Sequence, residues 1–326
     1  ICLSSYRFVL ACSYLVVPVI FCFHLSLTFI SRSDKIVNIE IRNVLKWEVF
    51  MNSLKKKMLE TELTDQQLGI FYLGQVGFLL KYRKCYFLID GYLSDYVDRN
   101  CSQLVKWVRR YPAPLKGEDL DFVDYVFCTH GHYDHADPDT LSAIGRVNKK
   151  ARFIVPNSVV TTVESYGIPS ERIMGVPTDK MFSLGEDVSF CAVPSAHEEL
   201  HPDGNGGYEE VGYRLVFGDI SLYHSGDCCI YDGLTDRVRN TDIMMLPVNG
   251  RDYYRRYRDD IIGCFDSVEA LTLARDAGAD LLIPTHFDLY DVNAVNPAWF
   301  VDAQQKVNPA QKYHIFMPGE LYIYCK

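Results

Sequence analysis

The sequence predicts an α/β protein whose strands and helices are layered in a sandwich. Three observations support this fold class. From Gly69 onward the chain opens with short apolar runs joined by turn signals, its later strands alternate with helical patterns, and it has no internal repeat. Hairpins followed by alternating strands and helices are typical of a layered α/β sandwich rather than of a doubly wound sheet. Hydrophobic residues make up 48% of the 326 residues, which allows a large buried core.

Short apolar runs bounded by turn residues predict the strands. The first three are connected through turn signals at Gly74-Gln75 and Arg83-Lys84, and a loop-rich segment with two prolines at Pro112 and Pro114 follows them. We expect strands at residues 70–73, 77–82, 86–90, 122–129, 152–155, 188–193, 211–217, 220–224, 243–247, 280–285, 314–317 and 321–324.

Capping signals predict three helices between these strands. Asp137 followed by Pro138 is a typical helix start, and the helix is expected to run to about Val147. A second helix is expected over 157–166, before the stop signal Gly167, and a third over 267–277, before Gly278. No break in composition after residue 50 requires a second domain.

The charge and the cysteines exclude some functions. The formal net charge is −9, and an acidic chain is a poor general ligand for nucleic acid, because phosphate backbones require clustered Lys and Arg. The eleven cysteines contain no CxxC pair and lie mostly within apolar runs. We therefore expect free, buried thiols in a reducing compartment, and a cytoplasmic protein.

Residues 1–50 form a segment of doubtful origin. Its apolar run over 9–30 is long enough to span a bilayer, and it would be a signal anchor if it is genuine. The chain begins with Ile1, however, and a plausible start lies at Met51, before a polar, Lys-rich opening. Codons for Trp47, Glu48 and Val49 can contain a ribosome-binding sequence. We expect residues 1–50 to be upstream sequence translated in frame, and residues 51–326 to form one domain.

The segment that carries the chemistry is Thr129-His-Gly-His-Tyr-Asp-His135, directly after an apolar strand. So many polar groups at the end of a core strand would be unfavourable unless a ligand binds them. Imidazole nitrogen and carboxylate oxygen suit divalent ions such as zinc or manganese. The loop therefore predicts metal ligands at His130, His132, Asp134 and His135.

Three more candidate ligands follow apolar strands. His197 comes after the strand at 188–193, Asp227 after the strand at 220–224, and His286 after the strand at 280–285. A single histidine at a strand end is weak support, since such residues are often structural. Together they predict one site, because side chains at the tips of several strands converge at one edge of an α/β sandwich.

The sequence HGHYDH resembles the H-x-H-x-D-H signature of the metallo-β-lactamase superfamily, and the later ligands have the order found there. The resemblance covers residues 68–326 and implies an αββα sandwich with two divalent metal ions, zinc or manganese. It implies that His130, His132 and His197 bind one ion, that Asp134, His135 and His286 bind the other, and that Asp227 bridges them.

Softer motifs are similar to the L-ascorbate-6-phosphate lactonase family. They are Leu73-Gly-Gln-Val-Gly-Phe78, Ile89-Asp90, Tyr92-Leu-Ser-Asp95, His224-Ser-Gly-Asp227, Phe265-Asp-Ser-Val-Glu269, His286-Phe-Asp288 and Pro318-Gly-Glu320. One departure is Gly91, where that family usually has proline. This resemblance implies hydrolysis of a sugar lactone such as L-ascorbate 6-phosphate by a metal-activated water.

Further residues are expected to contribute to catalysis and substrate binding. Asp134 is a candidate proton acceptor, although ligation alone is possible, and His224 is a catalytic candidate with strand packing as its alternative. His201 is a rival of His197 as a ligand. A small anionic substrate, such as a sugar phosphate, would suit the guanidinium groups of Arg251, Arg255 and Arg256.

Two other functions stay open from the sequence. One is a phosphodiesterase acting on a phospholipid or a nucleotide, and the other is a non-catalytic metal-binding scaffold. We expect a homo-oligomer that binds no nucleic acid, and no membrane unless residues 9–30 are a true anchor.

Overall fold

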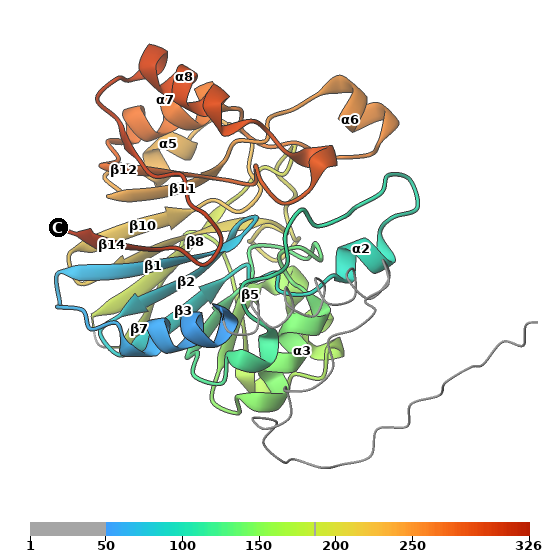
Figure 1. Cartoon of the computed structure of the whole chain (residues 1–326), viewed down its shortest axis with the longest axis vertical. Coiled ribbons are helices and arrows are strands. Elements are labelled where there is room, and N and C mark those ends of the chain that lie inside the picture. The colour runs from blue at the N-terminus through green and yellow to red at the C-terminus, as the bar shows by residue number, and fades with distance from the viewer. Residues whose placement is uncertain (1–49, 186) are drawn as a thin grey trace, which may run out of the picture. The chain divides into compact units, whose positions relative to one another are not determined.

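Two seven-stranded sheets form the centre of the described chain, which in this computed structural model comprises residues 50–185 and 187–326 (Figure 1). The first sheet has the order β14 (Leu321–Cys325), β1 (Gln67–Gly74), β2 (Gly77–Tyr82), β3 (Cys85–Ile89), β4 (Tyr125–Phe127), β5 (Arg152–Pro156) and β6 (Ile173–Val176). The second has the order β13 (Lys312–Tyr313), β12 (Leu281–Thr285), β11 (Ile243–Pro247), β10 (Ile220–His224), β9 (Val211–Phe217), β8 (Val188–Pro194) and β7 (Met181–Gly185).

Each sheet has an antiparallel half and a parallel half. In the first sheet β14, β1, β2 and β3 pair antiparallel, and β3 to β6 pair parallel. In the second, β7 to β10 pair antiparallel and β10 to β13 pair parallel. The carboxyl ends of parallel neighbours lie at the same edge of a sheet, so the loops that follow β3, β4, β10, β11 and β12 are brought to common edges.

Apolar side chains fill three layers. One cluster contains residues of both sheets, such as Ile70 and Leu215, and forms the core between them. A second joins the first sheet to the helix over residues 50–60, to α3 (Pro138–Val147) and to α4 (Val160–Ser165). A third joins the second sheet to α5 (Leu234–Arg237), α7 (Ser267–Ala277) and α8 (Pro297–Val307). The αββα sandwich expected from the sequence is confirmed.

The elements with clear sequence signals lie where they were expected. Strands β2, β9, β10 and β11 have the predicted bounds, and helices α3 and α7 match theirs. Asp137 caps α3 by accepting a hydrogen bond from the Asp139 amide, and Pro138 occupies the first turn. The helix expected over 157–166 is a 3₁₀ turn, Asn157–Val159, followed by α4.

Other elements differ from the sequence prediction. Strand β4 is only Tyr125–Phe127, and residues 314–317 are not a strand, because the chain pairs through Lys312–Tyr313 instead. The exposed strand β7 and the short strand β6 were not predicted, since neither is an uninterrupted apolar run. Also missed were α2 (Tyr96–Asn100), α5, α6 (Tyr253–Arg258) and α8.

Two expectations concern the thiols and the apolar N-terminal run. The eight cysteines among the described residues form no disulfide, and four of them are buried. No described helix has both the length and the apolar character that a bilayer span requires. The predicted anchor at 9–30 and the doubtful segment 1–50 lie outside the described residues, apart from residue 50.

The N-terminus of α7 allows the contribution of a capping box to be measured. The Asp266 side chain accepts hydrogen bonds from the Val268 and Glu269 amides, and Glu269 accepts one from the Asp266 amide. We expect Asp266→Ala to lower the free energy of unfolding by about 0.5–2 kcal/mol in urea denaturation. Asp276→Ala, at an exposed position of the same helix, should change it by less than about 0.5 kcal/mol. Equal losses in both variants would contradict the role of the cap.

Candidate metal centre

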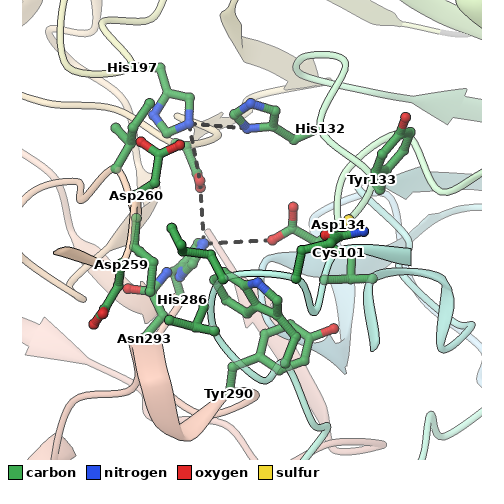
Figure 2. Close-up of a pocket in the computed structure, with 18 residues that line it drawn as sticks. Cys101, His132, Tyr133, Asp134, His197, Asp259, Asp260, His286, Tyr290 and Asn293 are labelled. Atoms are coloured by element: carbon green, nitrogen blue, oxygen red, sulfur yellow. Dashed lines mark hydrogen bonds and ion pairs between the residues drawn. The ribbon is translucent and has the colours of Figure 1, made fainter. Parts of the chain in front are cut away.

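All seven predicted ligands meet at one edge of the two sheets. His130, His132, Asp134 and His135 lie in the loop after β4, and the other three follow β8, β10 and β12. Figure 2 shows His132, Asp134, His197 and His286 directed towards a common space. Five of the seven are buried, whereas His132 is exposed and Asp134 is partly exposed, so the cluster opens to solvent on their side.

His130, His132 and His197 form the first group. The Nε2 atom of His130 lies 2.9 Å from Nδ1 of His132, and Nε2 of His197 lies 3.2 Å from the same atom. Two nitrogens bound to one tetrahedral zinc ion are about 3.3 Å apart, given Zn–N distances of about 2.0–2.1 Å. The three nitrogens are therefore spaced as ligands of a single ion.

Asp134, His135 and His286 form the second group, and Asp227 lies between the two groups. Asp134 Oδ2 is 3.8 Å from Nε2 of His135 and 3.9 Å from Nε2 of His286. Asp227 approaches His135 with Oδ1 at 3.4 Å and His286 with Oδ2 at 3.3 Å. Its Oδ2 is also 4.0 Å from Nε2 of His197 in the first group. This is the position that a bridging carboxylate requires.

The side chains fit divalent metal ions by chemistry as well as by spacing. His135 Nε2 and Asp227 Oδ1 are buried and lie 3.4 Å from each other, but neither forms a hydrogen bond of good geometry. A buried polar atom without a partner is unfavourable, and a cation coordinated at that point removes the penalty. Imidazole nitrogen and carboxylate oxygen are ordinary ligands of zinc and manganese.

A buried network behind the histidines fixes their orientation. Asp90 Oδ2 is 2.8 Å from Nδ1 of His135 and accepts the Thr129 hydroxyl at 2.7 Å. The Thr129 oxygen lies 3.1 Å from Nδ1 of His130 and can accept a hydrogen bond from that ring N–H, because its own hydrogen is directed at Asp90. Both rings are thus held with Nε2 free to bind a metal ion.

Gln75 connects the second group to the β1–β2 turn. Its side-chain amide nitrogen donates to Asp134 Oδ2 at 3.0 Å and lies 3.1 Å from Nε2 of His286. The Gln75 carbonyl accepts the backbone amide of His286 at 2.8 Å. Gln75, Asp90 and His286 all have positive φ, a conformation that side chains other than glycine rarely adopt. Backbone strain of this kind persists at sites that the surrounding structure holds in place.

Sequence reasoning did not assign site roles to Gln75, Asp90 or Thr129. Each stands at the end of an apolar strand, as the ligands do, and two of them belong to the motifs LGQVGF and ID. A polar residue directly after an apolar strand could therefore have identified all three as residues of the site.

His224 has a different environment from the one expected for a catalytic residue. It is buried, its Nδ1 accepts the Gly226 amide at 3.1 Å, and its Nε2 donates to the Val76 carbonyl at 2.8 Å. Both ring nitrogens are occupied, and His224 does not line the cavity, so it is placed to position the loop that carries Asp227. Gly226 has φ +60°, and a Cβ atom there would lie 2.7 Å from Thr129, which explains the glycine in this loop.

The three arginines expected to bind substrate contact other partners. Arg251 forms an ion pair with Glu269. Arg255 donates to the Asn293 side chain and to the carbonyls of residues 249 and 250. Arg256 forms ion pairs with Glu198 and Asp260. None of the three lines the cavity above the metal centre, so the prediction of phosphate contacts by these residues is not supported by their positions.

Two further residues that could coordinate a metal ion are His201 and Cys264, and they lie in different environments. His201, the rival ligand, has a 47% exposed side chain and pairs with Glu210 at 3.1 Å, outside the cluster. Cys264, which the sequence did not single out, is buried, and its sulfur lies within 4.8 Å of ligand atoms of His197 and Asp227. Burial and the Asp227 carboxylate raise the pKa of the Cys264 thiol well above its usual value, so it is neutral in the metal-free protein.

Proton affinity differs between the two groups. Burial lowers the pKa of His197 to about 4, and burial with neighbouring imidazoles holds the pKa of His130 well below its usual value. Burial also disfavours the charged form of His135 and His286, but nearby carboxylates, Asp227 above all, outweigh it and raise the pKa of both. In the metal-free protein His135 and His286 therefore have a higher proton affinity than His130 and His197.

A cavity of about 430 Å³ lies over the cluster. Its floor is formed by His132, Asp134, His197, Asp227 and His286. Its walls come from two segments without predicted ligands, residues 97–107 and 259–262, together with Tyr133, Tyr290 and Asn293. A substrate of the size of a small lactone can therefore reach the cluster.

Comparisons with known proteins agree with this geometry. Residues 86–287 match a family described as "Beta-lactamase superfamily domain". An uncharacterized protein of Mycobacterium tuberculosis is 27% identical over 244 residues, which are 71% of this chain and 64% of that protein. The chain thus spans about two thirds of the length of this relative.

A further relative and a solved structure are described as a metal-dependent hydrolase and a metallo hydrolase. A UPF0173 metal-dependent hydrolase of Methanosarcina mazei is 27% identical over 256 residues, 78% of this chain and 97% of the relative. The structure of Igni18, a metallo hydrolase of Ignicoccus hospitalis, has a TM-score of 0.58 at 19% identity and covers 79% of this chain and 98% of that chain. At this identity the structural match supports the fold alone.

The Asp90–His135 contact predicts an effect on metal affinity. We expect Asp90→Asn to weaken binding of zinc about 10–100-fold, because the amide is a poorer acceptor for the His135 ring proton. Competition with a chromophoric chelator measures this. Asp242→Asn is a matched control, since Asp242 accepts the Ser221 amide and hydroxyl as Asp90 accepts those of Thr129, but contacts no histidine. Equal losses in the two variants would show that only folding was affected.

The raised pKa values of His135 and His286 predict proton release on metal binding. Because the raised pKa values favour the protonated rings in the metal-free protein, and a ring must lose that proton to coordinate an ion, zinc binding should release about one proton or more per protein near pH 7. Calorimetric titration with zinc in buffers of different ionisation enthalpy measures this number. Release should decline as the pH rises above both values, and its absence at pH 7 would contradict the assignment.

Proposed function

We propose that this chain, which belongs to the β-lactamase superfamily domain family, is a metal-dependent hydrolase. It would bind two divalent ions, zinc or manganese, at the buried His/Asp cluster and hydrolyse a lactone or a related carboxylic ester. The observation that carries the proposal is the placement of Asp227 between two groups of three ligands on the floor of a cavity. When bound, such ions lower the pKa of water and polarise the oxygen atom that gains charge during hydrolysis.

The ligand assignment follows the two groups. His130, His132 and His197 would hold one ion and Asp134, His135 and His286 would hold the other, with Asp227 placed between the two groups. A carboxylate shared between two groups supports a two-ion centre rather than a scaffold with a single structural ion. A structural zinc site has four closed protein ligands, whereas this cluster is open on the side of His132 and Asp134.

Asp134 is the proposed proton carrier. It is the ligand carboxylate with the greater exposure, at 21% against 6% for Asp227, and it lines the cavity. Burial favours its neutral form, but His135 and His286 outweigh this and lower the pKa of Asp134, so the carboxylate is ionised at neutral pH. Gln75 holds Oδ2 in place, and the group can accept a proton from the attacking water and transfer it to the leaving oxygen.

The motifs shared with L-ascorbate-6-phosphate lactonases support a lactone ring as the reacting group. The phosphate of that compound has no support from Arg251, Arg255 or Arg256, which are bound elsewhere. The expected homo-oligomer stays a prediction.

Ligand and proton-carrier variants test the mechanism. Asp134→Asn should lower kcat/KM for a lactone or ester about 10²–10⁴-fold, the range found when a proton-transfer group is lost. His132→Ala should lower both the metal content and kcat/KM, because it removes a ligand of the first ion. Circular dichroism should show both variants folded. His201→Ala is the matched control, because this exposed histidine lies four residues beyond His197 and outside the cluster.

Wild-type-like rates in Asp134→Asn or His132→Ala would refute the site. The same assays should include a phosphodiester substrate. Turnover of the phosphodiester with no turnover of lactones and esters would replace the proposed reaction by phosphodiester hydrolysis at the same centre.

A further inference from the structure

The walls of the cavity differ in chemistry from its floor. Six apolar side chains line it above the metal centre: Val97, Leu104, Val105, Trp107, Ile261 and Ile262. Trp107 packs edge-on against Tyr290 at 5.1 Å between ring centroids, so part of the wall is a fixed aromatic surface. Among the described residues that line the cavity, none is lysine or arginine.

The charges on the wall are negative. Asp259 and Asp260 line the cavity, with side chains that are 13% and 78% exposed (Figure 2). The cations of neighbouring α6 are directed at these and other acids. Arg258 pairs with Asp259, and Arg256 pairs with Asp260 and Glu198. Lys106 belongs to the wall segment 97–107 but does not line the cavity.

From this wall we propose a substrate class: an uncharged lactone or ester whose apolar group lies against Trp107, Leu104 and Ile261–Ile262. The inference rests on the proposed hydrolase function and narrows its substrate. A phosphate group is recognised by convergent cationic and N–H donors. The polar wall residues Gln103, Asn293, Tyr133 and Tyr290 are neutral, so the wall supplies no cation to balance a phosphate.

The charge of the metal ions does not reverse this conclusion. Bound cations attract negative charge to the floor, where the reacting carbonyl oxygen lies. The part of the substrate remote from that carbonyl lies against residues 97–107 and 259–262. There the transfer of an apolar group out of water is favourable in free energy, whereas an anionic group would lose its hydration without gaining a cationic partner.

A series of matched substrates tests the proposal with the zinc- or manganese-loaded full chain. The series contains one γ-lactone carrying a hexyl chain, a hydroxymethyl group or a phosphorylated hydroxymethyl group. We expect kcat/KM for the hexyl lactone to exceed that for the phosphorylated lactone at least about 10-fold, since a few methylenes in an apolar pocket give discrimination of this order.

The outcomes separate the two proposals. A preference for the phosphorylated lactone would overturn the substrate class and leave the proposed hydrolysis intact. Absence of turnover with every lactone and with simple esters would overturn the proposed function, and the substrate class with it.

A charge introduced into the wall gives a second, independent measurement. Leu104 is 66% exposed, so Leu104→Lys should fold normally while placing a cation at the cavity. We expect this variant to raise the ratio of kcat/KM for the phosphorylated lactone over the hexyl lactone about 3- to 10-fold at low salt. The increase should largely disappear at about 1 M salt, where the Debye length is about 3 Å.

Val108→Lys is the matched control for this variant. Val108 lies four residues beyond Leu104, directly after the segment 97–107, is 54% exposed, and does not line the cavity. Its substitution should leave the ratio within about twofold of the wild-type value. An equal, salt-sensitive increase in both variants, or no increase in Leu104→Lys, would show that the wall at Leu104 does not contact the remote part of the substrate and would overturn the proposal.

Discussion

The carboxylate of Asp227 lies in a buried position between two groups of imidazoles, and much of the molecule serves to keep it there. A buried carboxylate is unfavourable without compensating charge. In the metal-free protein, burial opposes its ionisation, but His286 and His135 outweigh this and hold the pKa of Asp227 well below its usual value. Metal ions take over the same compensation when they bind. The loop from His224 to Asp227 is fixed in turn by hydrogen bonds of the His224 ring and by the contact between Gly226 and Thr129.

Asp90 is a second buried carboxylate, and hydrogen bonds stabilise its charge. This carboxylate is fully buried and is satisfied by the Thr129 amide, the Thr129 hydroxyl and the His135 ring. One residue thereby links the end of β3 to ligands of both groups, since Thr129 also reaches His130. The two sheets bring these strand ends to one edge, and the hydrogen bonds then fix the rotation of each ring. The fold sets position, and the buried polar network sets orientation.

Much of this arrangement could be predicted from the sequence, because the ligands follow uninterrupted apolar strands. The HGHYDH loop after β4 and the later His197, Asp227 and His286 share that pattern, and the bounds of α3 and α7 follow from their caps. Residues whose position in the sequence fits both a ligand and a structural role were harder to assign. A histidine such as His224 has the same strand-end position as a ligand, and only the hydrogen bonds of its two nitrogens distinguish it. The arginines Arg251, Arg255 and Arg256 resemble a phosphate site in sequence. Each nevertheless has a side-chain partner well separated from it along the chain: Glu269, Asn293 and Glu198, respectively. Cys264 gave no signal, because its neighbourhood depends on packing between segments far apart in sequence.

The division between floor and walls has a consequence for how the protein can diverge. The coordinating side chains stand at strand ends and are braced by buried partners, whereas the opposing surfaces of the cavity belong to two connecting segments, 97–107 and 259–262. Substitutions in these segments alter the shape and polarity of the cavity wall without changing the hydrogen bonds that Asp90, Thr129 and Gln75 make to the coordinating side chains. Libraries randomised only in these two segments would therefore vary substrate specificity while leaving the metal-binding residues unchanged. For the same reason, natural relatives with the same coordinating residues need not act on the same compounds.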